Sequence, residues 1–565
     1  MRQVTGTPQP LGMEKRNDTI NFSIVVPAGK KCELLLYKAG EAEPVKVFDM
    51  PQEDAVGEVR FLALDELDSE ICEYSYRIEG RMLLDPYAKS VSRTKAFGVS
   101  PDPQMHEIRA RITEDEYDWE DEKNPCIPYN EVIAYSLHVR GFTMHPSSGV
   151  KHKGTFRGII EKLDYIKALG VNQIQCMPVY EFNEMAGKKI NYWGYGDGYY
   201  FAPKASYSSS DDACRELKDM VKACHKEGIE VVLEMPFDGG ILPQTALTCL
   251  QYYRMEYHVD GFVINPYTVP WEMLINDPFL KGIKLLKKND WFQNTMRRFL
   301  KSDAGMLYEV TEALRHHTGV DGEYNYITTH TGFTMNDLVS YNEKHNESNG
   351  EKNQDGPEQN YSWNCGEEGP SRKRAVTELR KKQIRNAFAM LLLAQGTPCI
   401  LAGDEFRNTQ IGNNNVYCQD NEIAWLDWRN LKKHEELFHY VKKLIALRKT
   451  HFSLHKETVL TGEDKKKIGY PDISYHGEYA WQMPGGDANR QLGIMYCDAK
   501  DNMQDICYVA YNAHWDEKEF ALPTINGKTW FKIFDTAQEK PETGTAEEKR
   551  TIKVSGRSIV MLAAK

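Results

Sequence analysis

The sequence predicts an α/β fold: a (β/α)8 TIM barrel with an N-terminal β-sandwich domain and a C-terminal antiparallel β-domain. Three observations predict it. Residues 1–98 alternate in strand fashion, residues 129–448 repeat units of helix, glycine and strand, and strand patterns return over residues 449–565. Residues 99–128 form an acidic connector. A chain of 565 residues is too long for one small core, so several domains are expected.

The N-terminal region predicts a β-sandwich because three segments alternate apolar and polar residues, with Gly, Pro and Asp between them. These segments are residues 19–26, 32–37 and 73–78. The acidic run at residues 113–122 belongs on the surface, with Trp119 as a candidate anchor.

The central region predicts a parallel barrel. One helix ends at Gly170 and leads directly into a strand, and another opens after Ser210 with two aspartates in its first turn. A doubly wound sheet would place a Gly-rich phosphate turn after the first strand, and Arg140-Gly141-Phe142-Thr143 is not one. The expected strands are residues 132–139, 171–179, 229–237, 261–265, 284–288 and 397–402.

Composition argues against polyanionic and membrane partners. The 82 acidic and 70 basic residues leave a net charge of −12, without a long basic stripe, so no nucleic-acid partner is expected. No stretch reaches the roughly 20 apolar residues of a membrane helix, and residues 1–8 lack the apolar run of a signal peptide. A cytoplasmic location is therefore expected.

The twelve cysteines are scattered and form no Cys-x-x-Cys pair. They predict reduced core thiols rather than disulfides or a metal site. No cofactor is expected, and no His/Asp spacing resembles a calcium or transition-metal ligand set.

Polar side chains follow the expected barrel strands, where TIM-barrel enzymes place their chemistry. Asn265 ends the fourth strand and Lys288 the fifth, and the turn at residues 328–332 follows later. A loop at residues 191–197 adds Trp193 and Tyr195, whose flat rings suit sugar rings, although loop packing remains the alternative for Trp193. Carboxylates after other strands are Glu181, Asp238, Asp404 and Glu405.

Several longer motifs resemble bacterial glycogen-debranching enzymes of the isoamylase type, in the α-amylase superfamily (glycoside hydrolase family 13). The resemblance covers nearly the whole chain, because residues 1–98 also resemble the family's glycogen-binding-like sandwich. The motifs are Tyr135–Thr143, Asn191–Tyr195, Leu338–Glu347, Asn360–Gly366, Leu401–Phe406, Gly412–Asn415 and Trp425–Trp428.

The resemblance implies a retaining hydrolase of α-1,6 branches that uses a nucleophilic carboxylate, a carboxylic acid and a third carboxylate. At those positions this chain has Asn265, Lys288 and Thr331. The arginine that supports the nucleophile in the family is Val263 here, and the sugar-contacting histidine after the third strand is Gly239. The segment after Lys288 is also shorter than in the family, which leaves the sixth strand without an obvious position.

These losses predict a catalytically impaired or inactive homologue, because an amide cannot form an ordinary glycosyl-ester intermediate. The preferred hypothesis is a pseudoenzyme that binds α-glucan or serves as a non-catalytic subunit beside an active debranching paralogue, as the non-catalytic isoamylase subunit of plants does. The residues expected to contact glucan are Tyr195, His330, Trp193 and Asn265.

Two alternatives remain open at this stage. One is an active debranching enzyme with relocated carboxylates, in which Glu234 acts with Asp238 or Asp290. The other is a site for an anionic ligand such as a phosphorylated sugar, built on Lys288 and His330.

Overall fold

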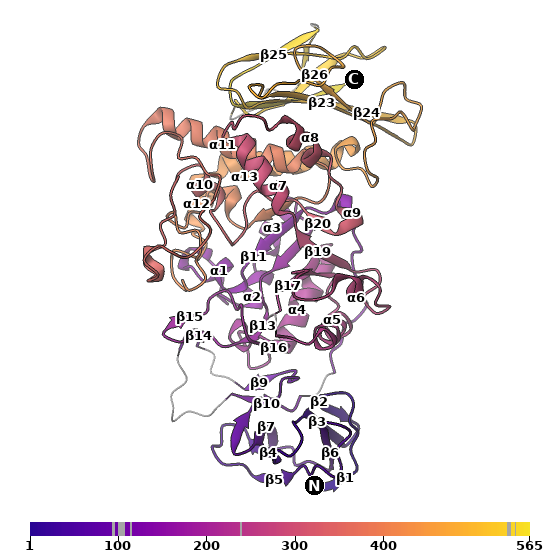
Figure 1. Cartoon of the computed structure of the whole chain (residues 1–565), viewed down its shortest axis with the longest axis vertical. Helices are drawn as coiled ribbons and strands as arrows, with labels where there is room; N and C mark the ends of the chain where they lie inside the picture. The colour runs from indigo at the N-terminus through magenta and orange to yellow at the C-terminus, as the bar shows by residue number, and fades with distance from the viewer. Residues whose placement is uncertain (93–95, 100–107, 114–115, 238–239, 539–543, 548–549) are drawn as a thin grey trace.

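The computed structural model describes residues 1–565 except 93–95, 100–107, 114–115, 238–239, 539–543 and 548–549. A β-rich N-terminal region lies at one end of the molecule, the parallel barrel in the middle and a second β-rich region at the other end (Figure 1). This order follows the chain.

The N-terminal region contains two antiparallel sheets around one core that includes Phe22, Leu34 and Tyr76. β10 (Arg109–Arg111) pairs with β7 (Ile71–Ile78) and β9 (Val91–Ser92), so a strand of this sheet lies within the residues expected to be a connector. One sheet has the order β1 (Arg2–Val4), β6 (Val59–Asp65), β3 (Thr19–Val25), β2 (Gly12–Arg16). The other has the order β5 (Lys46–Asp49), β4 (Cys32–Lys38), β7 (Ile71–Ile78), β10 (Arg109–Arg111), β9 (Val91–Ser92), with β8 (Arg81–Leu83) beside β7.

The predicted TIM-barrel class is confirmed. One sheet of parallel strands closes on itself through a bridge between Asn325 and Pro398. Its order is β20 (Glu323–Tyr324), β19 (Lys284–Lys288), β18 (Gly261–Ile264), β17 (Glu230–Met235), β12 (Gln173–Cys176), β11 (Ala134–Leu137), β21 (Cys399–Leu401).

The barrel sheet holds seven strands in the described part of the chain. Between β19 and β20 the described chain forms only the helices α7 (Asp290–Leu300), α8 (Leu307–Arg315) and α9 (Thr318–Asp321), so no further strand precedes β20. β19 therefore pairs directly with β20, with Lys288 beside Tyr324. This agrees with the difficulty of placing a sixth strand from the sequence.

Helices cover the outside of the barrel, and their ends follow the predicted signals. Asp212 caps α4 by accepting from the Arg215 N–H at 2.9 Å, and Gly170 ends α3 in a left-handed conformation with φ 100°. The single helix predicted before Gly170 is two short ones. The larger helices are α2 (Phe156–Ile160), α3 (Leu163–Leu169), α4 (Ala213–Lys226), α5 (Pro243–Tyr257), α7, α8 (Leu307–Arg315), α11 (Arg374–Leu392) and α13 (Glu435–Thr450).

The barrel interior is filled with side chains in layers, as expected for a packed core. Near the strand starts, Lys284 donates to Glu230 at 2.6 Å and Gln173 donates to the same carboxylate at 2.9 Å. An apolar layer above it includes Val232, Val263 and Leu286, which belong to one buried cluster.

The C-terminal region is antiparallel, as predicted. Its main sheet packs one face against α11 and the barrel helices, while the other face covers a smaller core. The main sheet has the order β22 (Ile473–His476), β23 (Gln491–Lys500), β24 (Met503–Asn512), β29 (Ser558–Ala564), β26 (Trp530–Asp535), β27 (Thr545–Glu547), and β25 (Lys518–Ala521) pairs with β28 (Thr551–Val554). Among the described residues, no helix is long and apolar enough to cross a membrane.

Candidate functional site

Four side chains form one hydrogen-bonded cluster at the barrel mouth: Glu234, Lys288, Tyr195 and His330. Glu234 Oε1 accepts from Lys288 Nζ at 3.1 Å and from the Tyr195 hydroxyl at 2.8 Å. The Tyr195 oxygen lies 2.5 Å from His330 Nε2. Because the tyrosine proton is donated to Glu234, His330 must donate through Nε2, which assigns its tautomer.

The cluster carries one negative and one positive charge. Burial alone would raise the pKa of Glu234, but Lys288, His330 and the hydrogen bond from Tyr195 together hold that pKa below its ordinary value. Burial, assisted by the charge of Lys288, lowers the pKa of His330 to about 3, so the imidazole is neutral at pH 7. The negative charge of Glu234 balances the positive charge of Lys288, which disfavours an anionic ligand at this cluster.

Lys288 reaches Glu234 across the intervening strand β18. The sheet register places Glu234 beside Val263 and Val263 beside Leu286, so Lys288 stands one inward position higher on β19. Val263 is small and apolar and leaves room for the lysine chain above it. The ammonium group of Lys288 therefore supplies the positive charge beside Glu234.

Asn265 and Thr331, which the resemblance assigned to the nucleophile and third-carboxylate positions, are both exposed. The Asn265 side-chain oxygen accepts from the Tyr267 N–H at 3.0 Å, and its backbone oxygen accepts from Thr268 N at 3.1 Å. Its amide oxygen therefore stabilises the turn that leaves β18. His330, which precedes Thr331, is buried instead, with 5% of its surface exposed.

The two aromatic residues predicted to contact glucan have different environments. Tyr195 is half-buried and uses its hydroxyl in the cluster, while Trp193 has only 5% of its surface exposed. The Trp193 ring packs edge-on against His330, with 5.1 Å between ring centroids, and also contacts Tyr417. Trp193 therefore lies in the wall of the mouth, and this placement agrees with loop packing.

The carboxylates beside the last barrel strand are occupied by structural hydrogen bonds. Asp404 accepts from Thr328 and from the Met335 N–H, and burial raises its pKa to about 7. Glu405 accepts from the Tyr135 hydroxyl at 2.6 Å and from Tyr165. Burial raises the pKa of Glu405 as well. These two carboxyl groups have separate partners, so they do not form a catalytic pair.

The other predicted carboxylates have three different outcomes. Glu181 is fully buried and accepts from Lys204 Nζ at 2.5 Å. Asp290 begins α7 and accepts a hydrogen bond from the hydroxyl of Tyr326. Asp238 lies outside the described residues.

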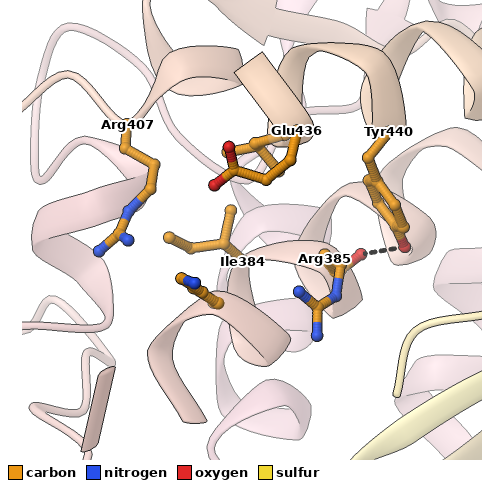
Figure 2. Close-up of a pocket in the computed structure, with 7 residues that line it drawn as sticks. Ile384, Arg385, Arg407, Glu436 and Tyr440 are labelled. Carbon is orange, nitrogen blue, oxygen red and sulfur yellow. Dashed lines mark hydrogen bonds between the residues drawn. The ribbon is translucent and has the colours of Figure 1, made fainter. Parts of the chain in front are cut away.

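The barrel region contains several pockets, of which two are described below. The first adjoins the cluster and is lined by Met177, Trp193, His330 and Gln410, among others. The second lies between α11 and α13 and contains none of the predicted site residues in its lining (Figure 2). Its side chains are Lys381, Ile384, Arg385, Arg407, Glu436, Leu437 and Tyr440.

Comparison with known proteins places the chain in a family. The catalytic-domain model of α-amylase matches residues 116–238. A glycogen operon protein GlgX homolog from Haemophilus influenzae is 32% identical, over 80% of this chain and 86% of that protein. The chain belongs to the glycogen-debranching, isoamylase-type family of the α-amylase superfamily.

Other relatives of this isoamylase-type chain agree with that membership. Isoamylase 1 of the Arabidopsis thaliana chloroplast is 29% identical, over 95% of this chain and 85% of that protein. Pullulanase from Paenibacillus barengoltzii, in a mutant complex with maltotetraose, superimposes with a TM-score of 0.75 at 20% identity, covering 98% of this chain and 95% of that one. This structural likeness concerns the fold.

Sequence reasoning named Glu234 only as a relocated carboxylate and did not pair it with Lys288. The signal was available in principle. A carboxylate near the end of the third predicted strand and a lysine at the end of the fifth were both visible in the sequence, and the structure brings Lys288 Nζ to 3.1 Å from Glu234 Oε1.

Proposed function

We propose that this protein is a catalytically inactive or strongly impaired member of the debranching family that binds α-glucan through the rebuilt barrel mouth. The observation that carries the proposal is the salt bridge between Lys288 and Glu234. The resemblance assigns Lys288 to the position of the family's catalytic acid, and the ion pair occupies the Glu234 carboxylate at the barrel mouth.

The chemistry of a retaining glycosidase requires two carboxyl groups about 5–5.5 Å apart, one nucleophilic and one protonated. At the mouth, Asn265 is an amide and Lys288 an ammonium group. Glu234 is held in its ionised form, because its pKa lies below the ordinary value, so it is a poor proton donor. Asp404 and Glu405 are buried among their own hydrogen-bond partners.

Glucan binding is proposed from the residues that remain. The half-buried ring of Tyr195 and the exposed amide of Asn265 stand at the same mouth, and neutral groups with aromatic faces suit sugars. The relatives include isoamylases, and the similar pullulanase was solved with maltotetraose. The role that we propose is therefore that of a non-catalytic subunit, beside an active debranching paralogue in the cytoplasm.

The test combines activity and binding on one preparation. Purified full-length protein is incubated with glycogen and amylopectin, and reducing ends are counted beside an active isoamylase. We expect rates lower by about ten-thousand-fold or more, because losses in a catalytic unit cost several powers of ten. Migration in native gels containing glycogen should nevertheless be retarded. Absence of both turnover and retardation would refute glucan binding.

A second candidate is an active α-1,6-glucan debranching enzyme with relocated carboxylates, favoured by the names of the relatives. It predicts measurable turnover that disappears in Glu234→Gln or Asp290→Asn. Turnover that depends on either carboxylate would replace the pseudoenzyme proposal.

A partner subunit can be tested separately. An active debranching paralogue from the same cell is mixed with this protein and followed by size-exclusion chromatography and by reducing-end release. Co-elution with altered activity on branched glucan is expected from a non-catalytic subunit, whereas independent elution with unchanged activity would contradict that role.

A further inference from the structure

We propose that His451, Asp505 and Cys507 form a binding site for one divalent transition-metal ion, with zinc as the best chemical match. The site lies far from the barrel mouth, where α13 meets the C-terminal sheet. His451 directly follows α13, and Asp505 and Cys507 are two residues apart on β24, so their side chains point to the same face of the sheet.

The three possible ligand atoms converge. Asp505 Oδ1 lies 2.8 Å from His451 Nδ1, and Cys507 Sγ lies 3.2 Å from the same nitrogen and 3.5 Å from the same oxygen. Tetrahedral zinc with ligand distances of about 2.0–2.3 Å separates its ligands by about 3.3–3.7 Å. Shifts of a few tenths of an ångström would therefore open the cluster enough to hold the ion.

Without a metal ion, the position of the His451 proton decides which hydrogen bonds form. If His451 Nδ1 carries a proton, it donates to Asp505 Oδ1, and the Cys507 thiol donates to the same oxygen at 3.5 Å. If Nδ1 is unprotonated, it can accept from the Cys507 thiol, but it then faces the Asp505 carboxylate as a second acceptor. A cation would satisfy nitrogen, oxygen and sulfur at the same time.

Ser453 adds a second, independent observation. Its backbone N–H donates to the other oxygen of Asp505 at 2.9 Å, which orients the carboxylate. Its hydroxyl is fully buried beside Cys507 and Asp505 and makes no hydrogen bond of ordinary geometry. This oxygen lies in position to act as a fourth ligand, or to form a hydrogen bond with a metal-bound water.

The donor set selects the class of metal. A thiolate, an imidazole and a carboxylate suit zinc or cobalt, whereas magnesium and calcium require oxygen ligands. Cys507 is fully buried, and its thiol proton would pass to solvent as the sulfur–metal bond forms. His451 is the most exposed ligand, with 15% of its side chain accessible, so it marks the route of entry.

A bound ion would join the last barrel helix to the C-terminal sheet. No metal site was expected from the sequence; His451 and Asp505 are 54 positions apart, and their spacing matches no short ligand motif. Only the packing of α13 against the sheet brings them together.

The experiment uses the full chain, purified under reducing conditions and freed of metal with a chelator. Titration with cobalt(II) should show uptake of one equivalent and a near-ultraviolet thiolate-to-cobalt charge-transfer band, and zinc should displace it. Cys507→Ser should lose the band. Asp505→Asn should weaken cobalt binding at least tenfold, because substitutions of residues around a metal ion typically lower its affinity by about 10–100-fold.

Cys497→Ser is the matched control, because Cys497 is equally buried on the neighbouring strand β23 but belongs to the core on the opposite face of the sheet. It should keep the cobalt band. Zinc should also raise the melting temperature of the wild type and of Cys497→Ser, but not of Asp505→Asn, which tests the site even if Cys507→Ser folds poorly. A folded wild type that takes up no stoichiometric cobalt, or a band unchanged in Cys507→Ser, would overturn the proposal.

Discussion

Lys288 Nζ lies 3.1 Å from Glu234 Oε1, and the two residues reach each other across β18 at the mouth of the barrel. The side chains are 24% and 12% exposed, so the pair is largely removed from water. Removal of either partner would leave the other as a mostly buried charge without compensation.

Removing the lysine should destabilise the fold. Lys288→Met leaves Glu234 as an unpaired, mostly buried carboxylate, for which a loss of about 3 kcal/mol is expected, since breaking a buried pair costs about 3–5 kcal/mol. Urea unfolding at pH 7 measures it. The double variant Lys288→Met with Glu234→Leu should recover most of the loss, because both charges are then absent. A double variant as unstable as the single one would show that the ion pair is not the cause.

Asn265→Asp alone should not restore hydrolysis. The new carboxylate would supply a nucleophile, but position 288 would still be a lysine, and Glu234 would still be ionised through its lowered pKa. Reducing-end release from amylopectin should therefore remain at the wild-type level. A large rise in turnover from this single change would mean that another group already acts as the acid.

Acid should destabilise the protein partly through His330. Its folded pKa of about 3 lies below the value of about 6.5 in unfolded chains, so the unfolded state binds more protons between these values and stability falls as pH falls. From pH 7 to pH 5 the loss from this residue should be about 2 kcal/mol, at about 1.4 kcal/mol per pH unit below 6.5.

His330→Gln should therefore flatten the pH dependence of the urea midpoint between pH 7 and pH 5. His439, whose side chain is 62% exposed on α13, provides the control: His439→Gln should leave the slope unchanged. Equal slopes for wild type and His330→Gln would show that this imidazole is not held neutral.

Two substitutions of Tyr195 should separate the effect of its hydroxyl on stability from the effect of its ring on glucan binding. Tyr195→Phe removes the hydroxyl that donates to Glu234, and a stability loss of about 1–3 kcal/mol is expected for a hydrogen bond to a charged group. Retardation by glycogen should change little, because the ring remains. Tyr195→Ala should reduce retardation strongly, while Tyr308→Ala, at an exposed residue on α8, should not. Identical retardation of all three variants would place the glucan elsewhere.

The predicted elements were recovered where local signals are strong. The segment 284–288 is β19 as predicted, and the helix predicted to open after Ser210 begins with its aspartate cap at Asp212. Apolar periodicity, caps and glycine stops act within a few residues, so a single sequence contains them. The number of barrel strands was harder to predict from the sequence, because closure of the sheet depends on pairing between β19 and β20, which are distant in the chain.

The sequence by itself determined the family and the barrel with its two flanking β-regions, and it led to the expectation that Asn265, Lys288 and Thr331 occupy the family's catalytic positions. Tertiary structure alone decided what those residues do. It paired Lys288 with Glu234, turned the Asn265 amide oxygen toward its own backbone turn, and brought His451 to Asp505. The physical reason is that side-chain partners and charges depend on distances in space, whereas sequence patterns report only neighbours along the chain.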